Sequence, residues 1–480
     1  MSQLVQREKP WYTPRVRGLP KIVLSLDVLL VLGVLAAVTL VPIAFLVPFN
    51  DEWLRMNYLA THSVWEWTVW HAETWVVRPT SEVILGLASL PNTRPALEHD
   101  FSVDTFLARF QAVYGLIALA YWAMLYANAA ILARSPRALP HTVLLWFGLL
   151  TCWFMSSELA YAFYWADGYG NILMPFTFCC CGLPLLVRDD LLAAVSGALL
   201  VIVGALGHEV ICIYALGFLL LALLLRRPET RPWRARAVWG VLFAILLGIV
   251  LWQLFGAGPS IRAEHYLRNV GKSYDLPNAW ANVREIQPLR ALISVLSGPL
   301  AIAIYRDRLG DLPERAQRDF ARQRWFWILL ALGTFVTCFL PLASVGLKKG
   351  RLAVSYYSVS THLLFGLLGV VLYPLLARWL DRALSSYRRV AGSLLPLLLL
   401  VAACSGNLDE YREAVVNLKP LRAQAFEYMH KLFDSPSTAR LRLCRPRHAY
   451  SKPGRMLTDR NQEQYFGLKF VYNRCAGEKR

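Results

Sequence analysis

The chain has 480 residues, of which 56% are hydrophobic and only 17% charged, and its formal net charge is +18 at pH 7. A soluble chain of this length normally carries more charge on its surface. The apolar residues gather in runs of about 16–27, the length that a helix needs to cross a hydrocarbon layer about 30 Å thick. This pattern excludes a soluble enzyme, a disordered chain and a β-barrel. The basic residues lie between the apolar runs without a nucleic-acid-binding motif, so the charge reflects membrane topology.

We predict an all-α polytopic membrane protein with about eleven transmembrane helices. The first apolar run, 21–47, is too long for the core of a signal peptide and lacks a small-residue cleavage pattern, so it is predicted to be an uncleaved span. An odd number of spans places the two termini on opposite sides of the membrane. The other ten spans are predicted at 106–132, 142–156, 172–187, 191–206, 210–225, 237–255, 290–305, 325–341, 353–377 and 390–404.

The stretch 191–225 decides the topology, because it is too long for one span and slightly short for two ordinary ones. A single helix would hold His208 and Glu209 in the middle of the bilayer, at a cost of several kcal/mol. A helical hairpin instead places this pair at its apex, near the membrane surface. The hairpin also leaves more Lys and Arg in the cytoplasmic segments than in the external ones, as the positive-inside rule requires.

With this topology the N-terminus is cytoplasmic and the C-terminus external. Residues 1–404 form the transmembrane domain, which includes a first external loop at 48–105, and residues 405–480 form a small basic external domain. Cys444 and Cys475 are the cysteines of that domain. A disulfide between them would suit an oxidising compartment, and two unpaired thiols are the alternative.

Two adjacent acids, Asp51 and Glu52, stand where the chain leaves the first span. One interpretation is helix capping, since an acid at a helix N-terminus accepts backbone N–H bonds and favours the helix dipole. The other is a general base held at the membrane surface. The two interpretations are compatible, because a capped acid is also an oriented one.

The rest of the first loop favours helices that lie on the membrane. Five tryptophans fall within 51–75, and tryptophan prefers the headgroup level, so one or two interfacial helices are predicted there. A further apolar helix is predicted at 80–90, with Pro79 in its first turn. Arg78, just before Pro79, is either a solvated interfacial anchor or a cation directed at an anionic ligand.

Three basic residues occupy the predicted external loop 342–352, where the positive-inside rule makes them unexpected. Lys348, Lys349 and Arg351 are therefore candidates for binding a phosphate, with topology as the alternative. Tyr357 and His362, at the start of the tenth span, are candidates for sugar or acceptor binding, with interfacial packing as the alternative.

Acids and aromatic residues alternate in the predicted loop 156–171. Glu158, Tyr161 and Asp167 suggest a sugar-binding wall in which rings stack on pyranose faces and carboxylates accept hydroxyl bonds; an aromatic belt also explains the rings. His208 and Glu209, at the hairpin apex, are further candidates for sugar or acceptor binding. A structural role at neighbouring helix ends is the alternative for His208.

An acidic pair after the first span, a loop of interfacial helices and an Arg-Pro element near its end resemble the GT-C superfamily of membrane glycosyltransferases. The resemblance is closest to bacterial members that modify surface polysaccharides, including O-antigen glucosyltransferases. It extends over the span pattern of the whole chain, but its motifs are short. The family's commonest pair is Asp-Asp or Glu-Asp, whereas this chain has Asp51-Glu52.

The resemblance implies an inverting transfer of a sugar from a polyprenyl-phosphate donor to a glycan or lipid acceptor, on the periplasmic face of the bacterial inner membrane. Asp51 would be the catalytic base, with Glu52 as second candidate, and Arg351 would contribute to phosphate binding. Such members typically need no metal, and no ligand spacing supports a metal on His208, Glu209 and Asp51. Two alternatives remain, a transporter or flippase and a polymerase or ligase of lipid-linked saccharides.

Overall fold

The computed structural model describes residues 50–97, 102–132, 168–186, 191–225, 233–270, 276–284, 286–306, 312–349, 354–388, 440–444 and 469–473, with isolated positions at 309, between 29 and 43, and between 390 and 401. Within these ranges the fold is helical, as the sequence predicts, with one small sheet. The helices of the first loop are α3 (Asn50–Leu59), α4 (Val64–Thr74) and α5 (Pro79–Ser89), followed by the 3-10 turns η2 (Leu90–Asn92) and η3 (Pro95–Leu97).

The remaining helices form the bundle and its connections. They are α6 (Val103–Leu132), η4 (Tyr169–Leu173, a π-helical turn), α10 (Met174–Leu186), α11 (Leu191–Ala205), α12 (Glu209–Leu225), α13 (Trp233–Phe255), α14 (Ala257–Val270), α15 (Leu276–Arg284), α16 (Pro288–Ile304), α17 (Leu312–Arg322), α18 (Arg324–Lys349) and α19 (Val354–Leu384).

Four of these helices are long and apolar enough to cross a membrane, which makes a membrane protein the natural interpretation of the fold. They contain Val103–Leu125, Arg236–Arg262, Arg324–Ala343 and Ser360–Leu384. Four shorter apolar helices pack beside them, at Gly170–Leu186, Leu191–Ala205, Glu209–Leu225 and Pro288–Ile304. The predicted spans 21–47, 142–156 and 390–404 lie largely or wholly outside the described residues, so the number eleven stays a prediction.

The predicted hairpin at 191–225 is confirmed as two helices. α11 ends at Ala205 and α12 begins at Glu209, with a turn between them. α10 packs closely on α11 because glycines meet at the contact: a Cβ atom on Gly182 would overlap the carbonyl oxygen of Gly197, and the reverse also holds. Small residues allow such close approach of helix backbones in an apolar environment, where packing rather than the hydrophobic effect drives association.

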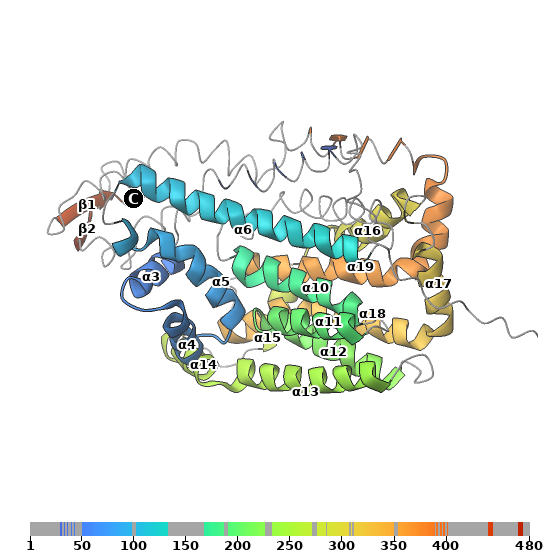
Figure 1. The fold of residues 1–480 in the computed structure, drawn as a ribbon, viewed down its shortest axis with the longest axis horizontal. Coiled ribbons are helices and arrows are strands. Elements are labelled where there is room, and N and C mark those ends of the chain that lie inside the picture. The colour runs from blue at the N-terminus through green and yellow to red at the C-terminus, as the bar shows by residue number, and fades with distance from the viewer. Residues whose placement is uncertain are drawn as a thin grey trace, which may run out of the picture.

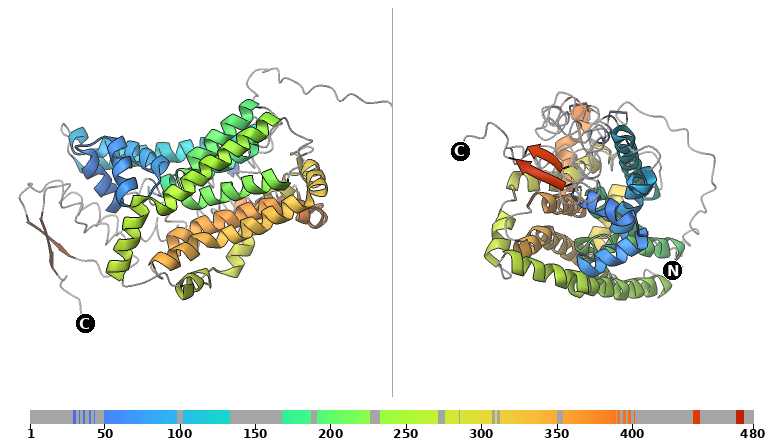
Figure 2. Two further views of the ribbon diagram at one scale, coloured as in Figure 1. Left: turned by 90° about the horizontal axis from the view of Figure 1, so that it is seen from below. Right: turned by 90° about the vertical axis from the view of Figure 1, so that its left-hand side faces the viewer.

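The elements predicted to be external lie together at one end of the bundle (Figure 1). This end holds α3, α4, α5 and α14, and α17 lies at the opposite end. Two short parallel strands near the C-terminus, β1 (Arg440–Cys444) and β2 (Lys469–Asn473), lie at the same end as α3 (Figure 2). The sequence analysis did not anticipate this sheet.

One predicted loop is wrong in its extent. Residues 342–349, predicted as the start of an external loop, continue α18 as helix to Lys349. Pro341 lies inside α18 and does not end it. Neighbouring helices can stabilise a membrane helix across a proline, since they provide contacts that compensate for the lost hydrogen bond.

Candidate functional site

An ion pair joins the first loop to the apex of the hairpin. The Arg78 guanidinium donates from Nε to Oε2 of Glu209 (3.0 Å) and from Nη2 to Oε1 (2.8 Å). The Arg78 side chain is 6% exposed and that of Glu209 is 28% exposed. Two parallel hydrogen bonds fix the plane of the guanidinium as well as its position. The pair therefore holds a cation at a defined place that solvent reaches from the carboxylate side.

Local structure explains how α5 reaches the hairpin. α5 begins at Pro79. Arg78, directly before it, has a backbone conformation that is not helical. One turn later the buried Ser81 hydroxyl lies within hydrogen-bond distance of two carbonyl oxygens, those of Gly170 (2.8 Å) and Gly207 (2.9 Å). A Cβ atom on Gly207 would overlap the Pro175 ring, so only glycine allows this approach. The first turn of α5 is thus fastened to both η4 and the hairpin turn.

His208 lies beside the ion pair and is 1% exposed. The backbone N–H of Val210 donates to His208 Nδ1 (3.2 Å), so this nitrogen is an acceptor and the neutral ring carries its proton on Nε2. His208 Nε2 has no hydrogen-bond partner among the described residues. The imidazole is 3.9 Å from the Glu209 carboxylate, measured from Nδ1 to Oε2. His208 thus contributes a buried N–H donor beside the charged pair.

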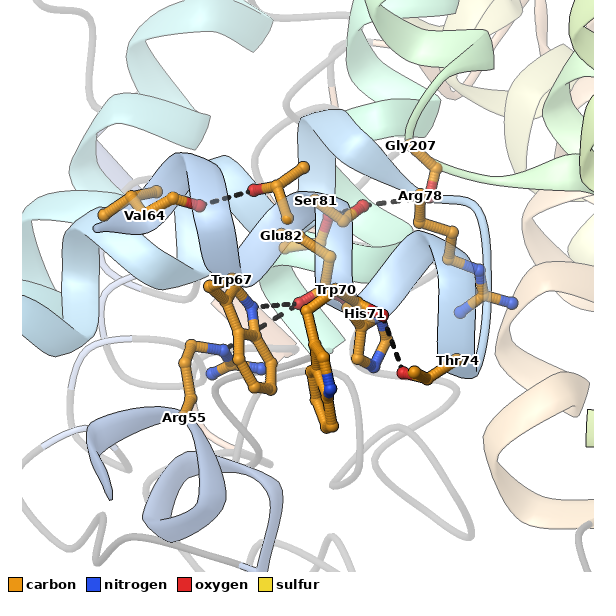
Figure 3. Close-up of polar contacts among 12 residues, drawn as sticks. Arg55, Val64, Trp67, Trp70, His71, Thr74, Arg78, Ser81, Glu82 and Gly207 are labelled. Carbon is orange, nitrogen blue, oxygen red and sulfur yellow. Dashed lines mark hydrogen bonds and ion pairs between the residues drawn. The ribbon is translucent and has the colours of Figure 1, made fainter. Parts of the chain in front are cut away.

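A second polar cluster, centred on the buried Glu82, holds the three helices of the first loop together (Figure 3). The Glu82 carboxylate accepts a hydrogen bond from Trp67 Nε1 at 2.8 Å, and Arg55 Nε lies 4.0 Å from the same oxygen. His71 Nδ1 lies 3.3 Å from the other carboxylate oxygen without hydrogen-bond alignment. The Arg55 guanidinium also lies over the Trp67 ring, 5.7 Å from its centroid. We call Arg55, Trp67, His71 and Glu82 the Glu82 cluster.

The environment of His71 keeps its imidazole neutral. Burial lowers the pKa of His71; the Glu82 carboxylate raises it, and the cationic Arg55, Arg78 and Arg262 lower it further. Arg262 belongs to α14 and stacks over the Trp75 ring at 5.1 Å, so α14 also faces this cluster. The His71 side chain is 14% exposed.

An apolar hollow lies between α5, α10 and α11. It is lined by Pro79, Thr80, Val83 and Ile84 of α5, Phe178 of α10 and Val203 of α11, and its volume is about 320 Å³. Neither Arg78 nor Glu209 is among the residues that line this hollow. Its apolar lining suits a hydrocarbon chain.

The two acids after the first span lie in the first turn of α3. The side chain of Glu52 is 1% exposed, whereas the side chain of Asp51 lies outside the described set. α3 is fixed on α6, because the buried Trp53 ring stacks on Phe106 with 5.4 Å between centroids and an interplanar angle of 3°. This stack joins the first turn of α3, which contains position 51, to the start of α6.

His362 lies in a packed environment in α19. It is 7% exposed, and its Nδ1 lies 3.2 Å from the Ser294 hydroxyl, which itself donates to the Arg290 carbonyl oxygen. These contacts join α16 to α19. The structure thus places His362 between two bundle helices.

Several predicted site residues cannot be placed. Lys348 and Lys349 lie in the last turn of α18, with side chains outside the described set. Tyr357 lies in α19 and Cys444 in β1, and their side chains also lie outside the described set. The others, outside the described residues altogether, are Glu158, Tyr161, Asp167, Arg351 and Cys475.

Sequence reasoning named Arg78 and Glu209 in separate roles and did not predict that they pair, and it missed Arg55, His71 and Glu82. One signal was available: Glu82 is the single charged residue of the predicted apolar helix 80–90, and such a charge is expensive to bury unless it is paired. Within the described part of the chain, no group of three or more His, Cys, Asp or Glu side chains could hold a metal ion.

Comparisons of the chain with protein-family models, with curated proteins and with solved structures gave no match.

Proposed function

We propose that the protein is an inverting glycosyltransferase that moves a sugar from a polyprenyl-phosphate donor to a glycan or lipid acceptor at the outer face of a bacterial inner membrane. The observation that carries this proposal is the oriented Arg78 guanidinium, which Glu209 holds through two hydrogen bonds while solvent reaches the carboxylate. A polyprenyl-phosphate sugar has an anionic head for this cation and a hydrocarbon chain for an apolar surface such as the hollow along α5.

The reaction needs a base and a stabilised leaving group. The acceptor hydroxyl attacks the anomeric carbon while its proton passes to a carboxylate, and the bond between that carbon and the phosphate oxygen breaks with inversion. The phosphate leaves as an anion, which cations stabilise without a general acid. Lys348, Lys349 and Arg351 remain proposed as additional cations for this phosphate, on the sequence pattern alone.

We assign the base to Asp51. Burial of Glu52 at 1% exposure removes it from contact with an acceptor, which supports this choice between the two acids. The anchoring of α3 on α6 by Trp53 supports it further, since a general base must be held within hydrogen-bond reach of the proton it takes. Glu209 then orients Arg78, and His208, as buried as Glu52, packs beside the pair without contacting the ligand.

The test is transfer of radiolabelled sugar by the purified protein, offered a panel of polyprenyl-phosphate sugars and candidate acceptors. Wild-type protein is expected to form product, and Asp51→Asn to lose it while still binding the donor. Asp104→Asn, at an exposed position of α6, is the matched control for a single acid-to-amide exchange and is expected to remain active. Flipping of the donor across vesicles without any transfer would overturn the proposal in favour of a flippase.

A further inference from the structure

The end of the bundle opposite to α3, α4 and α5 carries a group of exposed arginines. Here α17 lies across the ends of α18 and α19 and contacts both (Figure 1). Asp319 fixes α17 in this position, because its carboxylate accepts hydrogen bonds from Trp327 Nε1 of α18 (3.0 Å) and from Gln323 (3.0 Å). We call the exposed arginines of these three helices the arginine surface; they are Arg318, Arg322, Arg324, Arg378 and Arg382.

The arginine surface has no countercharge from the described part of the chain. None of its five guanidiniums forms an ion pair with a described acid, because the acids of these helices have other partners. Glu314 lies 3.5 Å from Arg306, and Asp381 is shared by Arg306 and Arg388. Asp319 is the acid that joins α17 to α18. The surface can therefore take an anion from outside these residues.

Two pairs of these arginines lie one helical turn apart. Arg318 and Arg322 share a face of α17, and Arg378 and Arg382 share a face of α19. Like charges at this spacing repel each other and destabilise a helix. An anion between the two guanidiniums removes this repulsion, and a phosphate can accept hydrogen bonds from both. Each pair is thus suited to a phosphate group.

The side chains around the arginine surface point to a lipid as the source of that phosphate. Trp325 is 71% exposed and Trp379 is 61% exposed, each directly after an arginine of the surface. One or two turns further along the same helices, Leu375 and Leu332 are 51% and 55% exposed. Both helices therefore pass from arginine through tryptophan to exposed apolar side chains, which is the order of headgroup, interface and hydrocarbon in a bilayer. A nucleic acid or an acidic protein in solution does not account for this order.

We propose that the arginine surface binds the phosphate headgroups of anionic phospholipids in the leaflet around this end of the bundle. The two arginine pairs hold headgroup phosphates, and Trp325 and Trp379 lie at the interface below them. The topology predicted from the sequence makes this leaflet the cytoplasmic one. The proposal does not depend on the proposed function, because the surface lies at the end away from the helices of the first loop.

The test is lipid binding by the full-length protein, purified in a neutral detergent and stripped of lipid. The protein is titrated with phosphatidylglycerol, with phosphatidylcholine of the same acyl chains, or with inorganic phosphate, and the midpoint of thermal unfolding is recorded. Phosphatidylglycerol is expected to raise the midpoint at lower concentration than phosphatidylcholine, and to lose this advantage as salt is added. Inorganic phosphate is expected to have little effect.

Variants locate the binding. Arg322→Gln and Arg382→Gln are each expected to weaken the binding of phosphatidylglycerol about fivefold, the contribution of one arginine at an anionic membrane surface. Arg322→Lys keeps the charge and is expected to retain most of the binding. Arg284→Gln is the matched control, because Arg284 is an exposed arginine that lies over the Trp280 ring of α15, outside the arginine surface. This control is expected to bind as the wild type does.

Four results would overturn the proposal. The first is equal affinity for phosphatidylglycerol and phosphatidylcholine. The second is inorganic phosphate that raises the midpoint as effectively as the anionic lipid, which would assign the arginines to a free anion. The third is equal loss in Arg284→Gln and Arg322→Gln, which would show that the charge of the whole molecule, not this surface, attracts the lipid. The fourth is bound nucleic acid that phosphatidylglycerol does not displace, which would assign the surface to a polyanion in solution.

Discussion

The pairing of Arg78 with Glu209 can be tested by a double-mutant cycle. Glu209→Gln leaves a guanidinium that is 6% exposed without its countercharge, whereas Arg78→Met leaves a carboxylate that is 28% exposed and can be rehydrated. Breaking a fully buried pair costs about 3–5 kcal/mol, and partial exposure of Glu209 reduces this. We therefore expect Glu209→Gln to lower the free energy of unfolding by about 2 kcal/mol and Arg78→Met by about 1 kcal/mol.

The measurement is reversible unfolding in mixed micelles for the wild type, both single variants and the double variant. Once one partner is gone, removal of the other should cost little, so the coupling energy is expected to be about 1–2 kcal/mol. Effects that add to within about 0.5 kcal/mol would refute the pairing, since independent sites behave in that way. Glu73→Gln, at an exposed position of α4, is the control for loss of a single carboxylate.

Three further predictions concern the neighbouring contacts. Gly207→Val should destabilise the protein by about 2 kcal/mol or more in the same unfolding assay, because its side chain would overlap Pro175, whereas Gly217→Val, in open space, should not. Trp67→Phe removes the indole N–H that Glu82 accepts, and should cost about 1–3 kcal/mol in thermal or chemical unfolding. His71→Gln should flatten the pH dependence of unfolding between pH 7 and pH 5.

The sign of the last prediction follows from burial. The pKa of His71 is lower in the folded chain than its ordinary value of 6.5, so the unfolded chain takes up a proton first as the pH falls. The stability that neutral His71 contributes is fully present above about pH 6.5, the ordinary pKa of the unfolded chain, and it is lost progressively as the pH falls below this value. A pH profile identical in the wild type and His71→Gln would show that His71 is not buried as described.

The hairpin shows what sequence could predict of the fold. The break between α11 and α12 follows from the length of 191–225 and from the cost of burying His208 and Glu209 in mid-bilayer. Both can be read from one continuous stretch of sequence, without knowledge of the tertiary structure. The helices of the first loop were predictable for the same reason, since Pro79 and the tryptophans are local signals. The extent of α18 was not, because its continuation past Pro341 depends on the helices packed against it.

The site was predictable only in part. Arg78 and Glu209 each stood out as a charged residue near a predicted membrane surface, but they are 131 residues apart, and no local pattern joins them. The Glu82 cluster could not be predicted for the same reason. Arg55, Trp67 and Glu82 come from three helices, and only the packing of these helices brings the indole N–H and the guanidinium to one carboxylate.

The proposed enzyme requires Asp51, Glu209 and Arg351 to face water on the periplasmic side of the membrane. Single cysteines placed at these three positions, in a background without the native thiols, can be labelled in intact spheroplasts with a membrane-impermeant maleimide. We predict labelling at all three positions before lysis, and none at position 318 in α17 until the membrane is opened. Labelling of any of the three only after lysis would contradict a shared periplasmic active site.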